Sequence, residues 1–437
     1  MKNFKNVYEA VQELRIVPAA IRKNKDFSQF DRDIPPLRGY LRKLDEWVQI
    51  FSEIKAIKSL FTDWMNEKVK SFPVNVKESL VAWEGFQEVQ KGPTGPLLGS
   101  SGFNQLIDDL VNYNRNFSIK SDKLKLFETA QSLLKRRFFS EFEKISIFSI
   151  NFKEALLELP RGTVRGGPFY GKGRVVDLDI INTLGHTPSD VVSSFKLTDF
   201  ILCVSGYRIS GSPYLNEAKF RLVFIPDMFY QYFMNGITKA MMQHLKEFPS
   251  FCGWLDPLKR EIVLKNAYLK ANKLGFKLIQ LDYSAYDKHI HPDIQRLTAS
   301  FFSSMFKDWA EVESSLLQKL SNQKILFFDK AGKSKFYTIN NQLISGKSDT
   351  QLTGSLIGLT LTLSYLIEKH GEEVASELID FLFQLGDDTL FPVDASNQEA
   401  YEKVLLEYSE SVSHYGFTLN PKKGVSKLRC RVPSKIN

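Results

Sequence analysis

The segment Phe381-Leu-Phe-Gln-Leu-Gly-Asp-Asp-Thr-Leu-Phe-Pro392 is an apolar run interrupted by two adjacent carboxylates, Asp387 and Asp388. Like charges side by side in an apolar segment repel each other and lose hydration unless a cation lies against them, and a divalent metal ion is the commonest such cation. The glycine before the pair permits a tight turn. The pattern therefore predicts a hairpin with strands over Leu378–Leu385 and Thr389–Val393 and with the carboxylates at its tip. Taken alone, an acidic hairpin tip is more often an exposed turn than a site.

The composition is that of a globular protein with a large core. The chain has 437 residues, of which 43% are hydrophobic, so it has room for two or three domains or one large multi-lobed unit. A formal net charge of +8 permits a nucleic-acid partner without requiring one. The 3 cysteines lie far apart and lack zinc-ligand spacing, which favours a reduced intracellular setting over a disulfide scaffold.

No secretion signal is expected at the N-terminus, because it carries acidic residues and no apolar core. The segment Thr350–Ile367 is uncharged, but it contains serine, threonine and glycine. We expect it to form a buried helix rather than a membrane span.

The first part of the chain, from Met1 to about Pro160, has apolar residues at three- and four-residue intervals, which is typical of amphipathic helices. The clearest examples are Leu37–Trp47, Ile50–Lys70 and Leu124–Ile147. A loop rich in glycine, proline and serine over Lys91–Gly102 separates them, and it lacks the ending of a phosphate-binding P-loop.

A second glycine-rich segment, Arg161–Arg174, alternates basic, glycine and aromatic residues. This pattern suits close contact with phosphates and base stacking, although a flexible basic loop would look the same. The candidate residues for such contacts are Arg165, Gly167, Pro168 and Lys172.

Alternation over Tyr214–Pro226 predicts a strand with Lys219 and Arg221 on one face. Two cations projecting together can bind a triphosphate, and a solvated sheet face is the alternative.

Two further segments carry polar groups, one at the end of a predicted strand and one at the start of a predicted helix, where taken alone they would only cap the helix. The strand-like run Phe276–Leu281 leads directly into Asp282, and Asp287 follows five positions later, which makes a second candidate for metal binding. The segment from Ser345 to Thr350 predicts a flexible turn that begins a long apolar helix. Between them we expect helices over Pro292–Phe306 and Trp309–Leu320 and a hairpin of Lys324–Phe328 with Lys335–Ile339. The pair His289 and His291 reads as exposed residues at a helix start rather than as metal ligands.

In this order the segments resemble the palm motifs of viral RNA-dependent RNA polymerases. Asp282-x-x-x-x-Asp287 resembles motif A, Ser345-Gly-x-x-x-Thr350 resembles motif B, and Gly386-Asp-Asp resembles motif C. The motif B pattern, which ends at Ser355, is most similar to partitivirus- and picobirnavirus-like polymerases of double-stranded RNA viruses. The resemblance extends over roughly Arg161 to Lys423 through three weaker matches: Lys219-Phe-Arg221 with motif F, Gly166-Gly-Pro168 with motif G, and Gly416–Lys423, after a helix Gln398–Tyr415, with motif D.

The resemblance implies an α+β right-hand polymerase with fingers and palm, an RRM-like antiparallel palm sheet with helices, a helix-rich N-terminal region and a short or missing thumb. The expected domains are a helical N-terminal region with fingers over 1–160, fingers over 161–275, and a palm over 276–424 with a fingers insertion at about 300–344. Residues 425–437 would begin a truncated thumb, or the thumb would belong to another polypeptide.

The implied reaction is template-directed RNA synthesis by two-metal nucleotidyl transfer, with Mg²⁺ or Mn²⁺ as the two ions. Asp282 and Asp387 would bind both ions, with Asp388 as an auxiliary ligand and the Tyr283 carbonyl completing the shell. The resemblance also implies triphosphate binding by Lys219 and Arg221, and template binding by Arg165, Gly167, Pro168 and Lys172. Nucleotide and 2′-hydroxyl recognition would fall to Asp287, Ser345, Gly346 and Thr350, and proton donation to pyrophosphate to Lys422 or Lys423. The chain departs from the widespread motif B pattern at Gly354, where many family members carry asparagine.

The implied partners are template and nascent RNA, ribonucleoside triphosphates, and a second polypeptide or a capsid protein, without a membrane. The implied location is the host-cell cytoplasm, in a virion or a replication complex. Two alternatives stay open. A reverse transcriptase has the same arrangement of palm carboxylates but usually carries Tyr-x-Asp-Asp where this chain has Leu385-Gly386-Asp-Asp. The other alternative is a non-catalytic RNA-binding relative, which the intact carboxylates disfavour.

Overall fold

The structure is a computed structural model that describes residues 117–161, 163, 165–169, 172–210, 219–328, 334–339, 343–394 and 397–419. Several sequence predictions lie outside these residues: the helices over 37–47 and 50–70, the loop over 91–102, the candidate general acids Lys422 and Lys423, and the segment 425–437.

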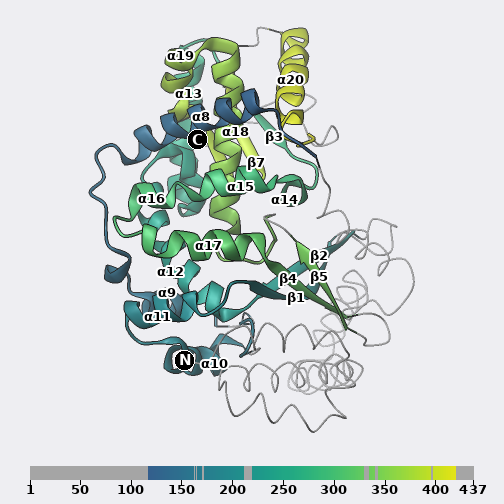
Figure 1. The fold of residues 1–437 in the computed structure, drawn as a ribbon. Coiled ribbons are helices and arrows are strands. Elements are labelled where there is room, and N and C mark those ends of the chain that lie inside the picture. The colour runs from purple at the N-terminus through teal and green to yellow at the C-terminus, as the bar shows by residue number, and fades with distance from the viewer. Residues whose placement is uncertain are drawn as a thin grey trace, which may run out of the picture.

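A long central helix and a small sheet form the middle of the molecule (Figure 1). The sheet is antiparallel, with strand order β3-β7-β6, and consists of β3 (Lys277–Asp282), β7 (Asp388–Val393) and β6 (Phe383–Leu385). The helix α18 (Thr350–His370) packs against β6 and β7, and α8 (Ser121–Phe139) packs against the helix. By length and composition α18 could cross a membrane, but 89% of its apolar window is buried inside the protein. It is the buried helix that the sequence predicts.

A second, four-stranded sheet lies to one side of this core (Figure 1). Its order is β2-β1-β4-β5, where β1 and β4 are parallel and the other pairs are antiparallel. The strands are β1 (Ile201–Ser210), β2 (Lys219–Pro226), β4 (Gln323–Phe328) and β5 (Ser334–Ile339). The hairpin expected at 324–339 therefore joins the strands at 201–226 in one mixed sheet.

The helices and both sheets contribute to one continuous hydrophobic core. Aromatic packing is prominent in it: the rings of Phe195 and Phe233 stack with centroids 4.2 Å apart. The remaining helices are α9 (Phe152–Leu157), α10 (Gly173–Leu184), α11 (Pro188–Lys196), α12 (Met228–Leu245), α13 (Pro257–Lys273), α14 (Tyr286–His289), α15 (Pro292–Ala299), α16 (Phe302–Met305), α17 (Ala310–Ser321), α19 (Glu372–Glu377) and α20 (Gln398–Ser413), with 3₁₀ turns at Ile147–Ser149, Pro249–Trp254 and Ile379–Phe381.

Three elements differ from the sequence prediction by more than two residues or are divided. The helix expected to reach Ile147 ends at Phe139, because Ile145 forms a β-bridge with Phe306. Ile145 exchanges backbone hydrogen bonds with the residues on either side of Phe306. The helix expected over 292–306 is two helices, and at the break the Ser300 hydroxyl donates to the Leu297 carbonyl. The first hairpin strand begins at 383 rather than 378, because the apolar run before it forms a buried 3₁₀ turn.

Candidate active site

Three carboxylates lie at one end of the three-stranded sheet. Asp282 is the last residue of β3 and is the cross-strand partner of Asp388, the first residue of β7. Asp387 lies in the turn before β7, where Gly386 adopts a φ of 63°. Asp387 and Asp388 are exposed and Asp282 is half-buried. The hairpin predicted from the sequence is confirmed, and with it the position of both carboxylates at its tip.

The loop before α18 is attached to the second sheet and to α12. The Phe224 N–H donates to the Ser345 carbonyl at 3.2 Å. The Gln231 side chain binds the loop backbone twice, because its Nε2 donates to the Gly346 carbonyl at 2.8 Å and its Oε1 accepts from the Ser348 N–H at 2.7 Å. Gly346 has a φ of 97°, and a Cβ on it would lie 1.9 Å from the Phe224 carbonyl oxygen, so only glycine fits there.

Buried polar side chains contact one another within and next to this loop. The Tyr230 hydroxyl donates to Asp349 at 2.9 Å, and burial together with Asp349 raises the pKa of Tyr230 well above its usual value. The Lys347 ammonium is buried 3.9 Å from Asp349, and it has no hydrogen-bond partner among the residues that the structure describes. Burial lowers the pKa of Lys347. The Thr350 hydroxyl donates to the Ile344 carbonyl at 2.8 Å, so towards any further group it can only accept.

Asp287 is half-buried. The residue before it, Tyr286, contacts α18, because its hydroxyl donates to the Gly354 carbonyl at 2.8 Å. Burial raises the pKa of Tyr286 well above its usual value, and nearby negative groups, Asp287 and Asp387 among them, add to the shift. Tyr286 therefore remains a hydrogen-bond donor. At Gly354, the position where the sequence departs from the motif B pattern, a Cβ would lie 3.4 Å from the Tyr286 ring.

The strand expected to carry Lys219 and Arg221 is confirmed as β2, and part of the predicted range, residues 214–218, lies outside the described residues. In the register of β1 and β2, Lys219 is opposite Ser210 and Arg221 is opposite Arg208. Their binding of a triphosphate stays a prediction.

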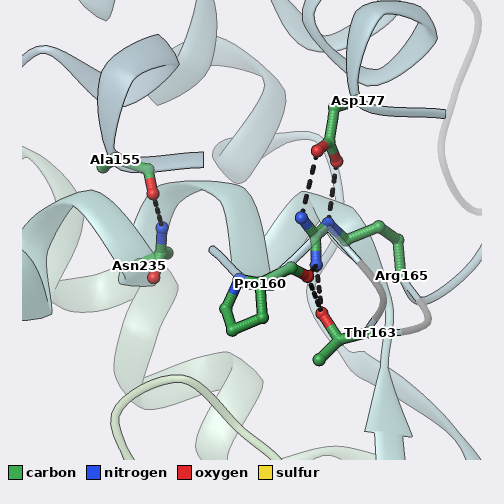
Figure 2. A network of polar contacts seen from close by, with 6 residues as sticks. All are labelled: Ala155, Pro160, Thr163, Arg165, Asp177 and Asn235. Carbon is green, nitrogen blue, oxygen red and sulfur yellow. Dashed lines mark hydrogen bonds and ion pairs between the residues drawn. The ribbon is translucent and has the colours of Figure 1, made fainter. Parts of the chain in front are cut away.

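Arg165, for which a template contact is expected, lies in an internal network of polar contacts (Figure 2). Its guanidinium is buried and donates to both oxygens of Asp177, at 2.8 and 3.0 Å. The remaining nitrogen, Nη1, donates to the Pro160 carbonyl at 3.4 Å and to the Thr163 hydroxyl. Every guanidinium nitrogen is thus engaged inside the protein. Gly167 and Pro168 are buried too, whereas Lys172 is exposed and stays available to a polyanion.

No ready-made metal cluster of three or more histidine, cysteine, aspartate or glutamate side chains occurs in the described ranges. The two histidines after motif A have other contacts: His289 Nδ1 lies 3.0 Å from the Ser284 carbonyl, and His291 caps α15. The candidate side-chain donors at the sheet end are carboxylates, which suit Mg²⁺ or Mn²⁺ rather than zinc.

Several residues that shape the site were not predicted from the sequence. Gln231 and Tyr230 lie on α12, and nothing in the local pattern indicates their contacts with a loop more than 100 residues away. The role of Gln384 could have been predicted, because it is the one polar residue in the apolar run Phe381–Leu385. A buried amide in such a run must find partners.

Comparisons with known proteins agree with the geometry. The family model described as "Viral RNA-dependent RNA polymerase" matches residues 77–434. No curated protein matches the chain. Among solved structures, the chain is similar to the RNA-dependent RNA polymerase of a human picobirnavirus, with 14% identity and a TM-score of 0.53 over 84% of this chain and 66% of that one. An insertion-loop deletion mutant of that polymerase gives 14% identity and a TM-score of 0.52 over 87% and 68%. At this identity the likeness concerns the fold, and the chain spans about two thirds of the length of these structures.

Proposed function

Because the chain belongs to the family of viral RNA-dependent RNA polymerases, we propose that it copies an RNA template by joining ribonucleoside triphosphates to an RNA 3′-hydroxyl, with release of pyrophosphate. The observation that carries this proposal is the register of β3 and β7, which pairs Asp282 with Asp388 beside Asp387. Separate segments of the chain thereby contribute carboxylates to one end of one sheet.

We assign the sheet β3-β7-β6 and the helix α18 to the palm, and the sheet β2-β1-β4-β5 to the fingers. The assignment rests on the motif positions: the residues of motifs A and C lie at the end of the first sheet, and the motif F-like residues lie in β2. The motif B-like loop accepts a hydrogen bond from β2 and leads into α18, so it connects the two parts.

Asp282 and Asp387 would hold two Mg²⁺ or Mn²⁺ ions, with Asp388 as an auxiliary ligand and the Tyr283 carbonyl as a further oxygen donor. When bound, such ions lower the pKa of the attacking hydroxyl and neutralise charge on the leaving pyrophosphate. Asp387 is exposed, so its side chain can change rotamer when a cation binds. This accounts for carboxylates that share one sheet end without forming a preassembled cluster.

The other residues would bind the nucleotide and the RNA. Lys219 and Arg221 would neutralise the triphosphate, and Lys172 would contact the template backbone. Asp287, Ser345, Gly346 and Thr350 would form the ribose site, where the Thr350 oxygen can accept from a 2′-hydroxyl because its own proton is donated to Ile344. The proton donor to pyrophosphate stays a prediction for Lys422 or Lys423.

The test is incorporation of labelled ribonucleotides on an RNA template by the wild type, by Asp387→Asn and by Asp394→Asn. Asp394 is an exposed carboxylate just past the other end of β7, so its variant is the matched control. We expect incorporation by the wild type and the control and none by Asp387→Asn. Equal incorporation by all three would refute the proposal. Preferential use of deoxyribonucleotides would favour a reverse transcriptase, and RNA binding without incorporation would favour a non-catalytic relative.

A further inference from the structure

We propose that Ser355 and Gln384 are positioning residues that hold the turn of Gly386, Asp387 and Asp388 in the shape that binds metal. The inference rests on the function proposed above and deepens it, because it names the groups that fix one of the metal-binding carboxylates. Both residues lie inside the protein, behind the turn, and neither is a candidate ligand.

Ser355 binds the turn from α18. Its hydroxyl is fully buried, accepts from the Gly386 N–H at 2.8 Å and donates to the Gln351 carbonyl at 2.8 Å. Because the proton is directed to the helix backbone, a lone pair of the oxygen faces the turn. The hydroxyl therefore has a defined orientation and holds the N–H of the residue just before Asp387.

Gln384 binds the same residue from the other side. Its Nε2 donates to the Gly386 carbonyl at 2.9 Å, and its Oε1 accepts from the Thr389 hydroxyl at 2.8 Å. Thr389 is also its cross-strand partner in the hairpin. Both backbone polar groups of Gly386 are therefore bound by buried side chains, so the peptide that leads into Asp387 has little freedom to rotate.

The surface of α18 accommodates this arrangement. A Cβ at Gly358 would lie 2.4 Å from the Gln384 amide, so a larger residue would displace the amide from the turn. One turn earlier, a Cβ at Gly354 would lie 3.7 Å from the Gly386 Cα. The helix thus approaches the hairpin closely enough for Ser355 to reach the turn.

Such attachment matters because the carboxylates at this end repel one another. Asp282 and Asp388 are directly opposite, and like charges in that position destabilise a strand pair. Without its two hydrogen bonds at Gly386 the turn would relax and move Asp387 away from Asp282. A metal site needs its ligands held to about 0.5 Å by surrounding groups.

The test measures Mn²⁺ binding to the full chain without RNA or nucleotide, by electron paramagnetic resonance of free Mn²⁺. We expect Ser355→Ala to weaken binding about tenfold, at the lower end of the effect of outer-shell substitutions. Ser355→Thr keeps the hydroxyl and is expected to retain near-wild-type affinity. The matched control is Thr360→Val. The Thr360 hydroxyl is buried on the same helix and donates to the carbonyl four residues back, but it does not contact the turn.

The outcomes separate the inference from the function on which it rests. Asp387→Asn should abolish the tightest Mn²⁺ binding, and if it does not, the proposed metal site itself is wrong. If Asp387→Asn loses binding while Ser355→Ala matches Thr360→Val, the positioning role is refuted and the function stands. Should Ser355→Ala fail to fold, Gln384→Met gives the same test: about tenfold weaker binding supports the inference, and unchanged binding overturns it.

Discussion

Replacing Arg165 by methionine should lower the stability of the protein more than it weakens RNA binding. The Arg165 and Asp177 side chains are only 4% and 7% exposed, so the substitution leaves the Asp177 carboxylate buried without its cation. Breaking a buried ion pair from one side costs about 3–5 kcal/mol. With an unfolding entropy of about 2 cal/mol/K per residue, the midpoint of thermal unfolding should fall by roughly 3–5 °C if the chain unfolds in one step.

The assay is a double-mutant cycle of Arg165→Met, Asp177→Leu and the double variant, followed by thermal unfolding and by RNA binding at two salt concentrations. An apolar pair of similar volume should recover most of the loss, because no buried charge remains. The salt dependence of RNA binding should match that of the wild type, since Arg165 releases no counterion from the RNA. An unchanged unfolding midpoint together with a shallower salt dependence for Arg165→Met would refute this reasoning and restore the template contact predicted from the sequence.

Three further predictions concern the site and the core. Asp387→Asn should be inactive in both Mg²⁺ and Mn²⁺, whereas Asp388→Asn should keep reduced or metal-shifted incorporation because Asp388 is proposed as an auxiliary ligand. If both variants lose incorporation equally in both metals, the proposed difference between the two carboxylates is wrong. Gln231→Ala removes two hydrogen bonds from the loop before α18 and should raise the KM for ribonucleotides about tenfold. The control is Asn235→Ala, which loses one hydrogen bond from the same helix to Ala155. Equal KM values for the two variants would count against the role of Gln231. Burial lowers the pKa of Lys319 to about 8 from an ordinary 10.5. Below pH 8 the folded protein must hold the buried side chain in its charged form, which lowers the free energy of unfolding. This loss of stability disappears as the pH rises from 8 to 10.5. Wild type should therefore gain about 2 kcal/mol over Lys319→Met between pH 7.5 and 9.5 in urea unfolding, and parallel pH profiles would exclude this titration.

The sequence predicted the features that local patterns determine. The strand ending in Asp282 follows from an apolar run that stops at a carboxylate, and the hairpin tip at Asp387 follows from a glycine between two apolar strands. Both are properties of a few consecutive residues. The start of α18 at Thr350 was equally readable, because a glycine-containing turn precedes a long apolar segment.

Features that depend on distant partners could not be predicted from local patterns. The pattern around Arg165 predicts a template contact, whereas in the structure its guanidinium donates to Asp177 on the following helix. The helix that ends at Phe139 has the periodicity to continue, but Ile145 pairs with Phe306 from a segment 161 positions later. In each case a tertiary contact outweighed a weak local preference.

The helix α18 links the two parts of the proposed site mechanically. Its N-terminal loop is bound to β2 and α12 through Ser345 and Gly346, and about one turn into the helix Gly354 and Ser355 contact Tyr286 and Gly386. Because the rest of the helix is packed inside the core, a shift at the loop cannot be absorbed further along and must move the helix as a unit. The loop proposed to bind the ribose and the turn that carries Asp387 are therefore both held by α18, so a substitution behind either of them should disturb both nucleotide and metal affinity.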